Sequence, residues 1–204
     1  MRIFVAGATG VLGAGLIPLL VSAGFEVAGM TRSAEKAAML REFGAEPVVC
    51  DVYDAAGLER AVCDYAPDLV MHQLTDLPDD VADLAAGRAA NARIRREGTA
   101  NLVAAAQAAG AKRFLAQSVA WDMSGEGQAA KEYLEETVLG IGGVVLRYGQ
   151  FYGPGTYYPD PTALPEPPRI HIAEATARTL VALDLAPGIY ALTEDGRMDF
   201  EPVR

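Results

Sequence analysis

The stretch Val5–Leu16, VAGATGVLGAGL, decides the fold of this chain. It carries the spacing Gly7-x-x-Gly10-x-x-Gly13 directly after a short apolar run. Between a strand and a helix, such glycines permit a tight turn, let a pyrophosphate approach the backbone and let the helix pack on the sheet. A purely structural turn is the alternative. The residues predicted to contact a cofactor here are Gly7, Thr9, Gly10, Val11, Leu12 and Gly13.

Short apolar runs alternate with alanine-rich helical patterns along most of the chain. Runs such as RIFVA and DLVMH have continuously apolar centres, IFVA and LVM, which is typical of parallel strands that helices cover on both faces. The alternation predicts an α/β fold with a doubly wound, mostly parallel sheet, the Rossmann fold. Strands are expected at Arg2–Ala6, Glu26–Met30, Glu46–Cys50, Asp68–His72, Lys112–Gln117, Gly143–Arg147 and Gly188–Leu192, and helices at Val11–Ser22, Ala34–Phe43, Ala55–Asp64, Asp80–Ala109 (as one segment or broken), Gln128–Leu139 and Ile172–Leu185.

The character of the chain changes after Arg147. The segment Tyr148–Arg169, YGQFYGPGTYYPDPTALPEPPR, is rich in proline, glycine and tyrosine and predicts an ordered loop. The C-terminal residues beyond this loop are too few to bury a large core of their own. We therefore expect one domain, residues 1–204, in which residues 148–204 form a reduced C-terminal substrate lobe.

Charge and composition exclude several classes of protein. The chain has 204 residues, 51% of them hydrophobic, and a formal net charge of −10. Such an acidic chain does not favour nucleic acid or an anionic membrane surface as a partner. No apolar run reaches membrane-spanning length, and the chain starts directly with a predicted strand, so a cytoplasmic location is expected. Cys50 and Cys63 lack the spacing of metal ligands and are expected to be reduced, buried thiols.

The end of the second predicted strand, GMTRSAEK, bears on the choice of cofactor. A carboxylate at this position would bind the adenosine ribose hydroxyls and favour NAD. Instead, Arg32 follows the strand, with Thr31, Ser33 and Lys36 nearby. Cations and hydroxyls suit a 2′-phosphate, so the sequence predicts NADP rather than NAD. A solvated arginine at a strand end is the alternative for Arg32.

Several motifs together resemble the short-chain dehydrogenase/reductases, in particular their NAD-dependent epimerase/dehydratase (extended or atypical) group. They are GATGVLG, CDVYD, PDLVMHQLTDLP, NARIRREGTANLVAAAQAAGAKRFLAQS, LRYGQFYGPGT and RIHIAEATARTLVAL. The resemblance implies that Asp51 and Val52 flank the adenine and that Gln73 to Thr75 pass the ribose and pyrophosphate. Asp51 as a turn cap and His72 as a satisfied polar residue are the alternatives. The other cofactor contacts expected are Leu74, Gln117, Lys131 and Tyr148.

Members of this family use a Tyr-x-x-x-Lys pair and a nearby Ser or Thr, and this chain departs from that pattern. Lys131 precedes Tyr133 by two residues, so the two side chains point about 200° apart on a helix and cannot both face one cofactor. The apolar stripe lies on the Lys131 side, which puts Tyr133 on the outer face. Gly127 stands at the tyrosine position. The catalytic candidates are Ser118, Lys131 and a tyrosine of the 148–158 loop, for which Tyr152 is named.

These observations predict an NADP-binding atypical reductase of this family. It would transfer a hydride to or from a small oxygenated substrate, or epimerise it by a redox step, with water, Ser118 or a loop tyrosine as proton donor. The alternative is a non-catalytic NADP-binding sensor or partner-binding protein. A flavin or quinone reductase ranks last. The expected partners are a small-molecule substrate and a second copy of the chain, through helices 80–109 and 128–139.

Overall fold

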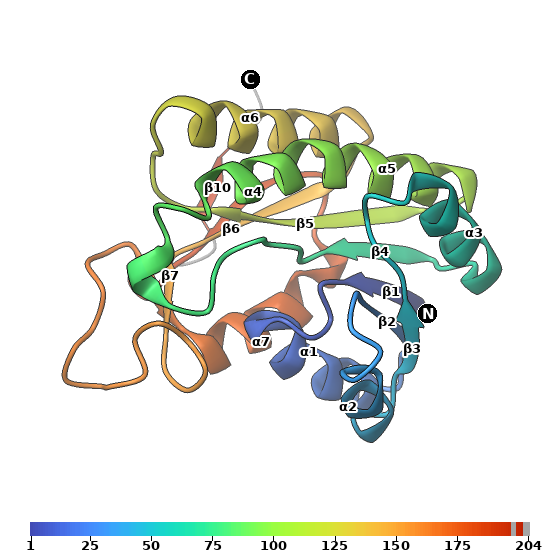
Figure 1. The fold of residues 1–204 in the computed structure, drawn as a ribbon, viewed down its shortest axis with the longest axis horizontal. Helices are drawn as coiled ribbons and strands as arrows, with labels where there is room; N and C mark the ends of the chain where they lie inside the picture. The colour runs from blue at the N-terminus through green and yellow to red at the C-terminus, as the bar shows by residue number, and fades with distance from the viewer. Residues whose placement is uncertain (197–198, 202–204) are drawn as a thin grey trace.

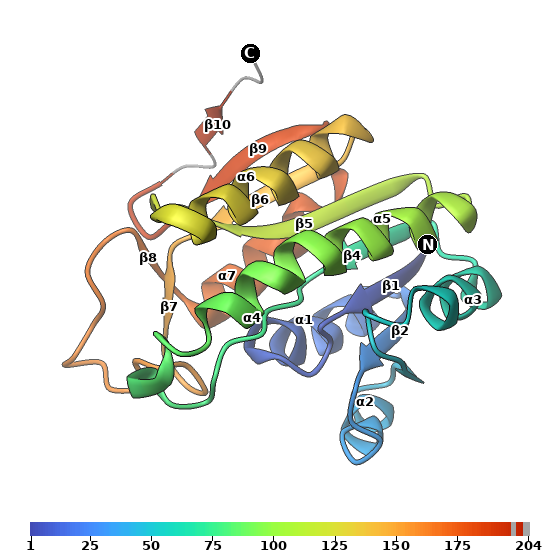
Figure 2. The ribbon, with the colours of Figure 1, turned by 45° about the horizontal axis from the view of Figure 1, so that its top comes forward.

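The computed structural model describes residues 1–196 and 199–201. Within them, eight strands form one sheet in the order β3-β2-β1-β4-β5-β6-β9-β10 (Figures 1 and 2). Every pair from β3 to β9 is parallel, and β10 runs antiparallel to β9. The strands are β1 (Arg2–Ala6), β2 (Glu26–Thr31), β3 (Glu46–Val49), β4 (Leu69–His72), β5 (Arg113–Val119), β6 (Val144–Tyr148), β9 (Gly188–Leu192) and β10 (Asp199–Glu201).

Helices cover both faces of this sheet, which confirms the predicted doubly wound fold (Figure 1). On one face lie α1 (Val11–Ser22), α2 (Ala37–Glu42), α7 (Ile172–Val181) and the 3₁₀ helix η3 (Ala182–Asp184). On the other lie α3 (Ala55–Tyr65), α4 (Arg88–Arg93), the π-helix η2 (Ile94–Gly98), α5 (Thr99–Ala108) and α6 (Gly125–Gly140), with the 3₁₀ helix η1 (Val81–Asp83) ahead of α4.

Alternate residues of the central strands pack into two hydrophobic cores, one on each face of the sheet. In β1, Ile3 and Val5 pack with α1 and α7, whereas Phe4 and Ala6 pack with the helices of the opposite face. Successive side chains of a strand point to opposite faces, so a strand buried on both sides is apolar at every position. This is the physical reason why residues 3–6 of β1, IFVA, are all apolar.

The 80–109 segment takes the broken form of the prediction, as η1, α4, η2 and α5. Two other predictions about local structure need correction. Helix α6 begins at Gly125 rather than Gln128. The proline-rich segment predicted as loop contains strands β7 (Gln150–Tyr152) and β8 (Arg169–His171), which pair in parallel. Its prolines lie between the two strands, so they leave this pairing intact. The last residues of the predicted lobe, 202–204, lie outside the described residues.

The strand order reverses between β1 and β4, and ligands of such sheets bind at the carboxyl ends of the strands beside this reversal. In the described part of the chain, no helix is long and apolar enough to cross a membrane. Nor do the described residues contain a group of three or more His, Cys, Asp or Glu side chains placed to hold a metal ion. Cys50 and Cys63 are free thiols that are partly rather than fully buried.

Candidate active site

A cavity of about 1170 Å³ lies at the carboxyl ends of the central strands. Its wall combines the turn after β1, the end of β2, the loop after β4, one side of α4 and η2, and the segments that come after β5 and β6. The predicted site residues on this wall are Gly7, Thr9, Gly10, Val11, Leu12, Thr31, Arg32, Gln73, Leu74, Gln117, Ser118 and Tyr148. The predicted residues that do not line it are Gly13, Asp51, Val52, Lys131 and Tyr152.

The three glycines of the turn have different surroundings. Gly7 has φ +88°, and a Cβ there would lie 2.4 Å from the Gln73 carbonyl oxygen. A Cβ on Gly13 would lie 2.3 Å from the Gly7 carbonyl oxygen. At Gly10, a Cβ would meet only that oxygen, at 3.4 Å. Gly7 and Gly13 are therefore required by packing, whereas Gly10 keeps the entrance to α1 open to a ligand.

Gln73 provides an independent sign of a polar ligand. Its side chain is 4% exposed, and neither its amide nitrogen nor its amide oxygen has a hydrogen-bond partner among the described residues. A buried amide without partners is costly unless something supplies them. Gln73 lies on the cavity wall beside the glycine turn. These residues therefore fit a dinucleotide, which carries both donors and acceptors and has its phosphates at such a turn.

The end of β2 brings cations and hydroxyls to one side of the cavity. Thr31 Oγ1 lies 3.3 Å from Thr9 Oγ1 and accepts a hydrogen bond from the Ser33 backbone N–H. The Arg32 guanidinium lies 3.3 Å from an Asp76 carboxylate oxygen across the cavity mouth, and its side chain is 55% exposed. Lys36 completes this group on the wall.

Asp51 and Val52 occupy positions away from the cavity wall. An Asp51 carboxylate oxygen accepts a hydrogen bond from the Tyr53 backbone N–H at 3.0 Å, as the turn-cap alternative required. Val52 is 1% exposed, and its carbonyl accepts from the Asn101 side chain. Contact of either residue with an adenine stays a prediction.

Ser118 belongs to a buried polar cluster. Its hydroxyl donates to Glu135 Oε1 at 2.5 Å, and the Arg147 guanidinium binds both Glu135 oxygens, at 2.9 and 2.8 Å. Ser118 is 2% and Glu135 5% exposed. A bidentate pair between an arginine and a carboxyl group is among the strong, geometrically specific hydrogen-bonded pairs of proteins. The Ser118 proton is thus directed at Glu135, and the lone pairs of its oxygen are available to the cavity.

Lys131 and Tyr133, which depart from the Tyr-x-x-x-Lys pattern, lie on opposite sides of α6: one is buried and the other exposed. Lys131 is 4% exposed and its ammonium donates to the Trp121 carbonyl at 3.2 Å, whereas Tyr133 is 41% exposed, which confirms its predicted outer position. Gly127 lies one turn before Lys131 and lines the cavity. A Cβ on Gly127 would come within 3.1 Å of the Met123 methyl group. Met123, in the segment before α6, therefore fills space that a larger side chain at position 127 would need. The same segment supplies the Trp121 carbonyl that accepts the hydrogen bond from Lys131.

His72 is a satisfied core residue rather than a group of the cavity wall. Its Nδ1 accepts from the Leu74 backbone N–H, so the proton lies on Nε2, which donates to Thr99 Oγ1 at 2.9 Å. Burial, aided by the nearby charge of Arg95, lowers the pKa of His72 to about 4. His171 accepts a hydrogen bond from the Ala173 backbone N–H and caps α7.

The tyrosines at and after the end of β6 separate into three environments. The Tyr148 hydroxyl donates to Thr179 within the core, and this burial raises the pKa of Tyr148. The Tyr152 ring lies edge-on to His171, outside the cavity wall. Tyr157 lies on the wall, and its hydroxyl donates to the Pro78 carbonyl. Among the loop tyrosines, the structure brings Tyr157 and Tyr158, not Tyr152, to the cavity.

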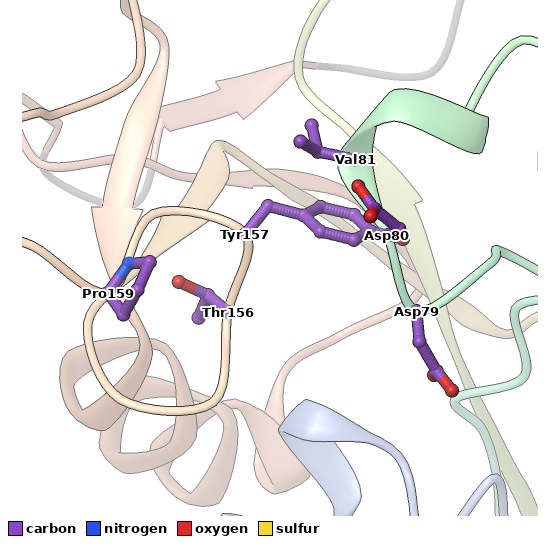
Figure 3. A pocket seen from close by; sticks show the side chains of 6 residues that line it. All are labelled: Asp79, Asp80, Val81, Thr156, Tyr157 and Pro159. Atoms are coloured by element: carbon purple, nitrogen blue, oxygen red, sulfur yellow. The ribbon is translucent and has the colours of Figure 1, made fainter.

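Figure 3 shows how Tyr157 closes one side of the site. Its ring extends from the segment after β7 toward Asp80 and Val81 at the start of η1. The hollow around it, of about 400 Å³, is lined by Asp79, Asp80, Val81, Thr156, Tyr157 and Pro159. The Tyr157 hydroxyl binds the backbone of the loop after β4, so this loop and the segment after β7 are in contact where both line the cavity.

Sequence reasoning missed the charged residues of α4, η2 and α6. Arg95 lines the cavity with 7% exposure, and Glu135 joins Ser118 to Arg147. A helical face would have indicated the first of these, since Leu84, Arg88, Asn91 and Arg95 recur at intervals of three and four residues. No local pattern indicates the pairing of Glu135 with Arg147, because their partnership depends on how α6 packs on the sheet.

Comparisons with known proteins agree with this architecture. The model of the NAD dependent epimerase/dehydratase family matches residues 3–138. A 3-diazoavenalumate denitrifying reductase from a Streptomyces species is 38% identical over 182 residues, covering 78% of this chain and 59% of that protein. An uncharacterised protein of Schizosaccharomyces pombe is 44% identical over 66 residues, 31% of this chain and 22% of its own. The chain thus spans about three fifths of the first relative's length.

Solved structures show the same fold at low sequence identity. A UDP-glucose 4-epimerase of Thermus thermophilus in complex with NAD superposes with a TM-score of 0.73 at 21% identity, over 95% of this chain and 78% of that one. The UDP-Glc/GlcNAc 4-epimerase of Campylobacter jejuni gives a TM-score of 0.77 at 13% identity, over 95% and 78% of the two chains.

Proposed function

Because this chain belongs to the NAD dependent epimerase/dehydratase family, we propose that it binds a nicotinamide dinucleotide in the cavity and transfers a hydride to or from a small organic substrate. The observation that carries the proposal is the continuity of the cavity, which extends from the glycine turn to Ser118. Gly7 and Gly10 would receive the phosphates, and Gln73, whose buried amide has no partner, would bind a polar group of the cofactor. When bound, the cofactor supplies hydride chemistry.

The proposed cofactor is NADP rather than NAD. Arg32 directly follows β2, where a carboxylate would favour NAD, and Lys36 lies on the same side of the cavity. The pair of Arg32 with Asp76 is largely exposed, and exposed pairs contribute little free energy. A 2′-phosphate, which carries more charge, would displace Asp76 from Arg32.

Cofactor titration tests this preference. NADPH should bind more tightly than NADH, and Arg32→Ala should weaken NADPH binding by about 1–3 kcal/mol, as expected for lost charge-assisted hydrogen bonds. NADH binding should stay nearly unchanged in this variant. Arg41→Ala, an exposed arginine of α2 that does not line the cavity, is the matched control and should have no effect. Equal affinities of the wild type for NADPH and NADH would contradict the proposal.

The polar cluster restricts which substrates suit the site. A carbonyl group that receives a hydride also needs a proton on its oxygen. The Ser118 hydroxyl already donates its proton to Glu135, which also binds Arg147, so toward a substrate Ser118 is a better acceptor than donor. No phenol stands one turn before Lys131, because that position is Gly127. The site therefore favours either oxidation of a hydroxyl that donates to Ser118, or reduction that requires no proton.

Reductive loss of nitrogen from a diazo compound is a reaction of the second kind. The C–H bond forms with the hydride while the electron pair of the C–N bond leaves with N2, so atoms and charges balance without an acid. The relative that is 38% identical is named as a denitrifying reductase of a diazo compound. The absent phenol and this likeness together make an aryl diazonium group the preferred reducible function in our proposal.

Turnover with 4-hydroxybenzenediazonium tests the proposed chemistry. NADPH deuterated at the transferable position should yield phenol with deuterium at the carbon that lost nitrogen, together with one N2 for each NADPH oxidised. Gly10→Val, which we expect to be unable to bind the cofactor, measures the uncatalysed background. A panel of ketones, alcohols with NADP⁺, and sugar nucleotides covers the remaining reactions. Cofactor binding without turnover of any of these would favour the sensor alternative.

Two further expectations concern the location of the protein and its oligomeric state. We expect a cytoplasmic protein and a homodimer that uses the outer sides of α4, α5 and α6, where Tyr133 is exposed. Sedimentation of the wild type and of Tyr133→Glu tests the dimer, since a charge in the contact should shift the equilibrium toward monomer.

A further inference from the structure

Arg95 is a buried cation that makes no hydrogen bond to a carboxylate in the part of the chain that the structure describes. It lies in the π-turn η2, where the helical hydrogen-bond pattern is interrupted, and such turns recur at functional sites. Its side chain reaches the cavity wall although the residue is only 7% exposed. In the described residues, the hydrogen-bond partner of its guanidinium is the Met123 sulfur, at 2.8 Å.

A thioether is a poor partner for a guanidinium. Sulfur is a weak acceptor, and a buried guanidinium has five N–H donors to satisfy. The nearby carboxylate, Glu135, already accepts hydrogen bonds from Ser118 and from both sides of the Arg147 fork. It attracts Arg95 only through space, and burial lowers the pKa of Arg95 despite this attraction.

Arg147 provides the comparison within the same molecule. Both arginines approach Glu135, but Arg147 makes two short hydrogen bonds with it and Arg95 makes none. A buried charge is tolerated when it is paired and hydrogen-bonded, and is costly otherwise. The environment of Arg95 is thus completed by an anion that enters from the cavity.

The position of Arg95 indicates which anion this is. Cofactor phosphates are expected at the glycine turn after β1, whereas Arg95 contacts Met123, in the segment between β5 and α6. Planar side chains of Trp121, Tyr157 and Tyr158 line the same cavity. Arginine binds carboxylates in a bidentate manner, and aromatic side chains pack well against planar rings.

We propose that Arg95 binds the carboxylate of the substrate and thereby selects small aromatic acids. This rests on the proposed function, since it assumes that the cavity also holds a cofactor. Arg95 acts as a specificity residue and takes no part in hydride or proton transfer. Without substrate, the Met123 sulfur accepts a hydrogen bond from the Arg95 guanidinium, and the substrate carboxylate replaces this sulfur as the acceptor.

Calorimetric titration of trans-cinnamate and its uncharged amide, cinnamamide, tests the proposal with and without saturating NADP⁺. The wild type should bind cinnamate at least about 10-fold more tightly than the amide, as for one charge-assisted pair. Arg95→Met should remove this difference, and Arg95→Lys should restore part of it. Arg96→Met removes the neighbouring charge, which is exposed and off the cavity wall, and should keep the full difference.

Two further measurements separate the possible failures. The affinity for NADPH should be equal in the wild type and Arg95→Met, and a loss in the variant would mean that Arg95 binds the cofactor instead. The melting temperature of Arg95→Met without ligands should equal or exceed that of the wild type, because an apolar side chain replaces an unpaired buried charge. A large decrease would assign Arg95 a structural role and overturn the proposal.

Equal binding of cinnamate and its amide by the wild type would also overturn it. If the wild type binds no NADPH at all, the proposed function fails, and the preference for the carboxylate is then decided by the titration without cofactor.

Discussion

The end of the cavity near β1 is formed mainly by backbone atoms, whereas the end near β5 and α6 is formed mainly by side chains. At the end near β1, backbone atoms form the wall, and the limits are steric: Gly7 and Gly13 leave no room for a Cβ. At the end near β5 and α6, charged side chains form the site, and Ser118, Glu135 and Arg147 satisfy one another. The first end therefore depends on the absence of side chains. The second depends on each partner being present, and this allows its chemistry to change while the fold stays the same.

The largest effect should come from breaking the side-chain end. Glu135→Gln would break the largely buried ion pair with Arg147 and remove the carboxylate that Ser118 binds, and this should lower the free energy of unfolding by about 3–5 kcal/mol. Urea unfolding measures the change. Glu97→Gln is the matched control, because its partner Arg93 is exposed and exposed pairs contribute little free energy. Equal losses in the two variants would mean that the buried cluster is not stabilising.

Gly10→Val should break the backbone end without unfolding it. A Cβ at Gly10 meets one oxygen at 3.4 Å, so the fold accommodates it, but the side chain occupies the space in front of α1. We expect NADPH affinity to fall by at least about 100-fold, or about 2.7 kcal/mol. The shift in melting temperature that NADPH causes in the wild type should vanish. Gly140→Val, at the end of α6 where a Cβ would have open space, is the control. A full thermal shift in Gly10→Val would disprove the assignment of the turn.

His72, which is fully buried at the end of β4, should make the protein sensitive to acid. Its pKa is 6.5 when unfolded and about 4 in the fold, so the unfolded state binds more protons between these values. The stabilisation by neutral His72 is complete above pH 6.5 and is lost as the pH falls toward 4, with a total of roughly 3 kcal/mol at 1.36 kcal/mol for each pKa unit.

Urea unfolding at a series of pH values measures this loss. The glutamine amide nitrogen can replace the Nε2 donor to Thr99, and glutamine does not titrate, so His72→Gln should flatten the profile between pH 6.5 and 4. His171→Gln removes the only other histidine of the chain and should retain the wild-type slope. Parallel slopes in the two variants would assign the acid sensitivity to carboxylates.

The smallest effects distinguish Lys131 from Tyr133. Trp121 is the only tryptophan of the chain and its carbonyl accepts the hydrogen bond of Lys131, so its fluorescence reports on this segment. Lys131→Met should shift the emission maximum and weaken NADPH binding by a few-fold, since Trp121 lines the cavity. Tyr133→Phe should change neither, within about 0.5 kcal/mol, as for a surface substitution. The opposite result would mean that Tyr133 faces the site.

The sequence by itself determined the fold class, the glycine turn and the outward position of Tyr133. These depend on interactions between residues that are close in sequence: the alternation within strands, the Gly-x-x-Gly-x-x-Gly spacing and the 100° step of a helix. Arg32 was predicted at the cofactor site from its place at the end of the second strand, whereas Gln73 and Ser118 were predicted there from the resemblance to the family.

Only the tertiary structure decided the partners of the charged groups. Lys131 was expected at the cofactor, but its ammonium binds the Trp121 carbonyl, and Tyr152 was expected at the active site, but its ring contacts His171. Arg95 meets Met123 across 28 residues of chain, and Tyr157 meets Pro78 across 79. A long side chain reaches any of several neighbours, and packing of the helices on the sheet selects which neighbour is within hydrogen-bond distance.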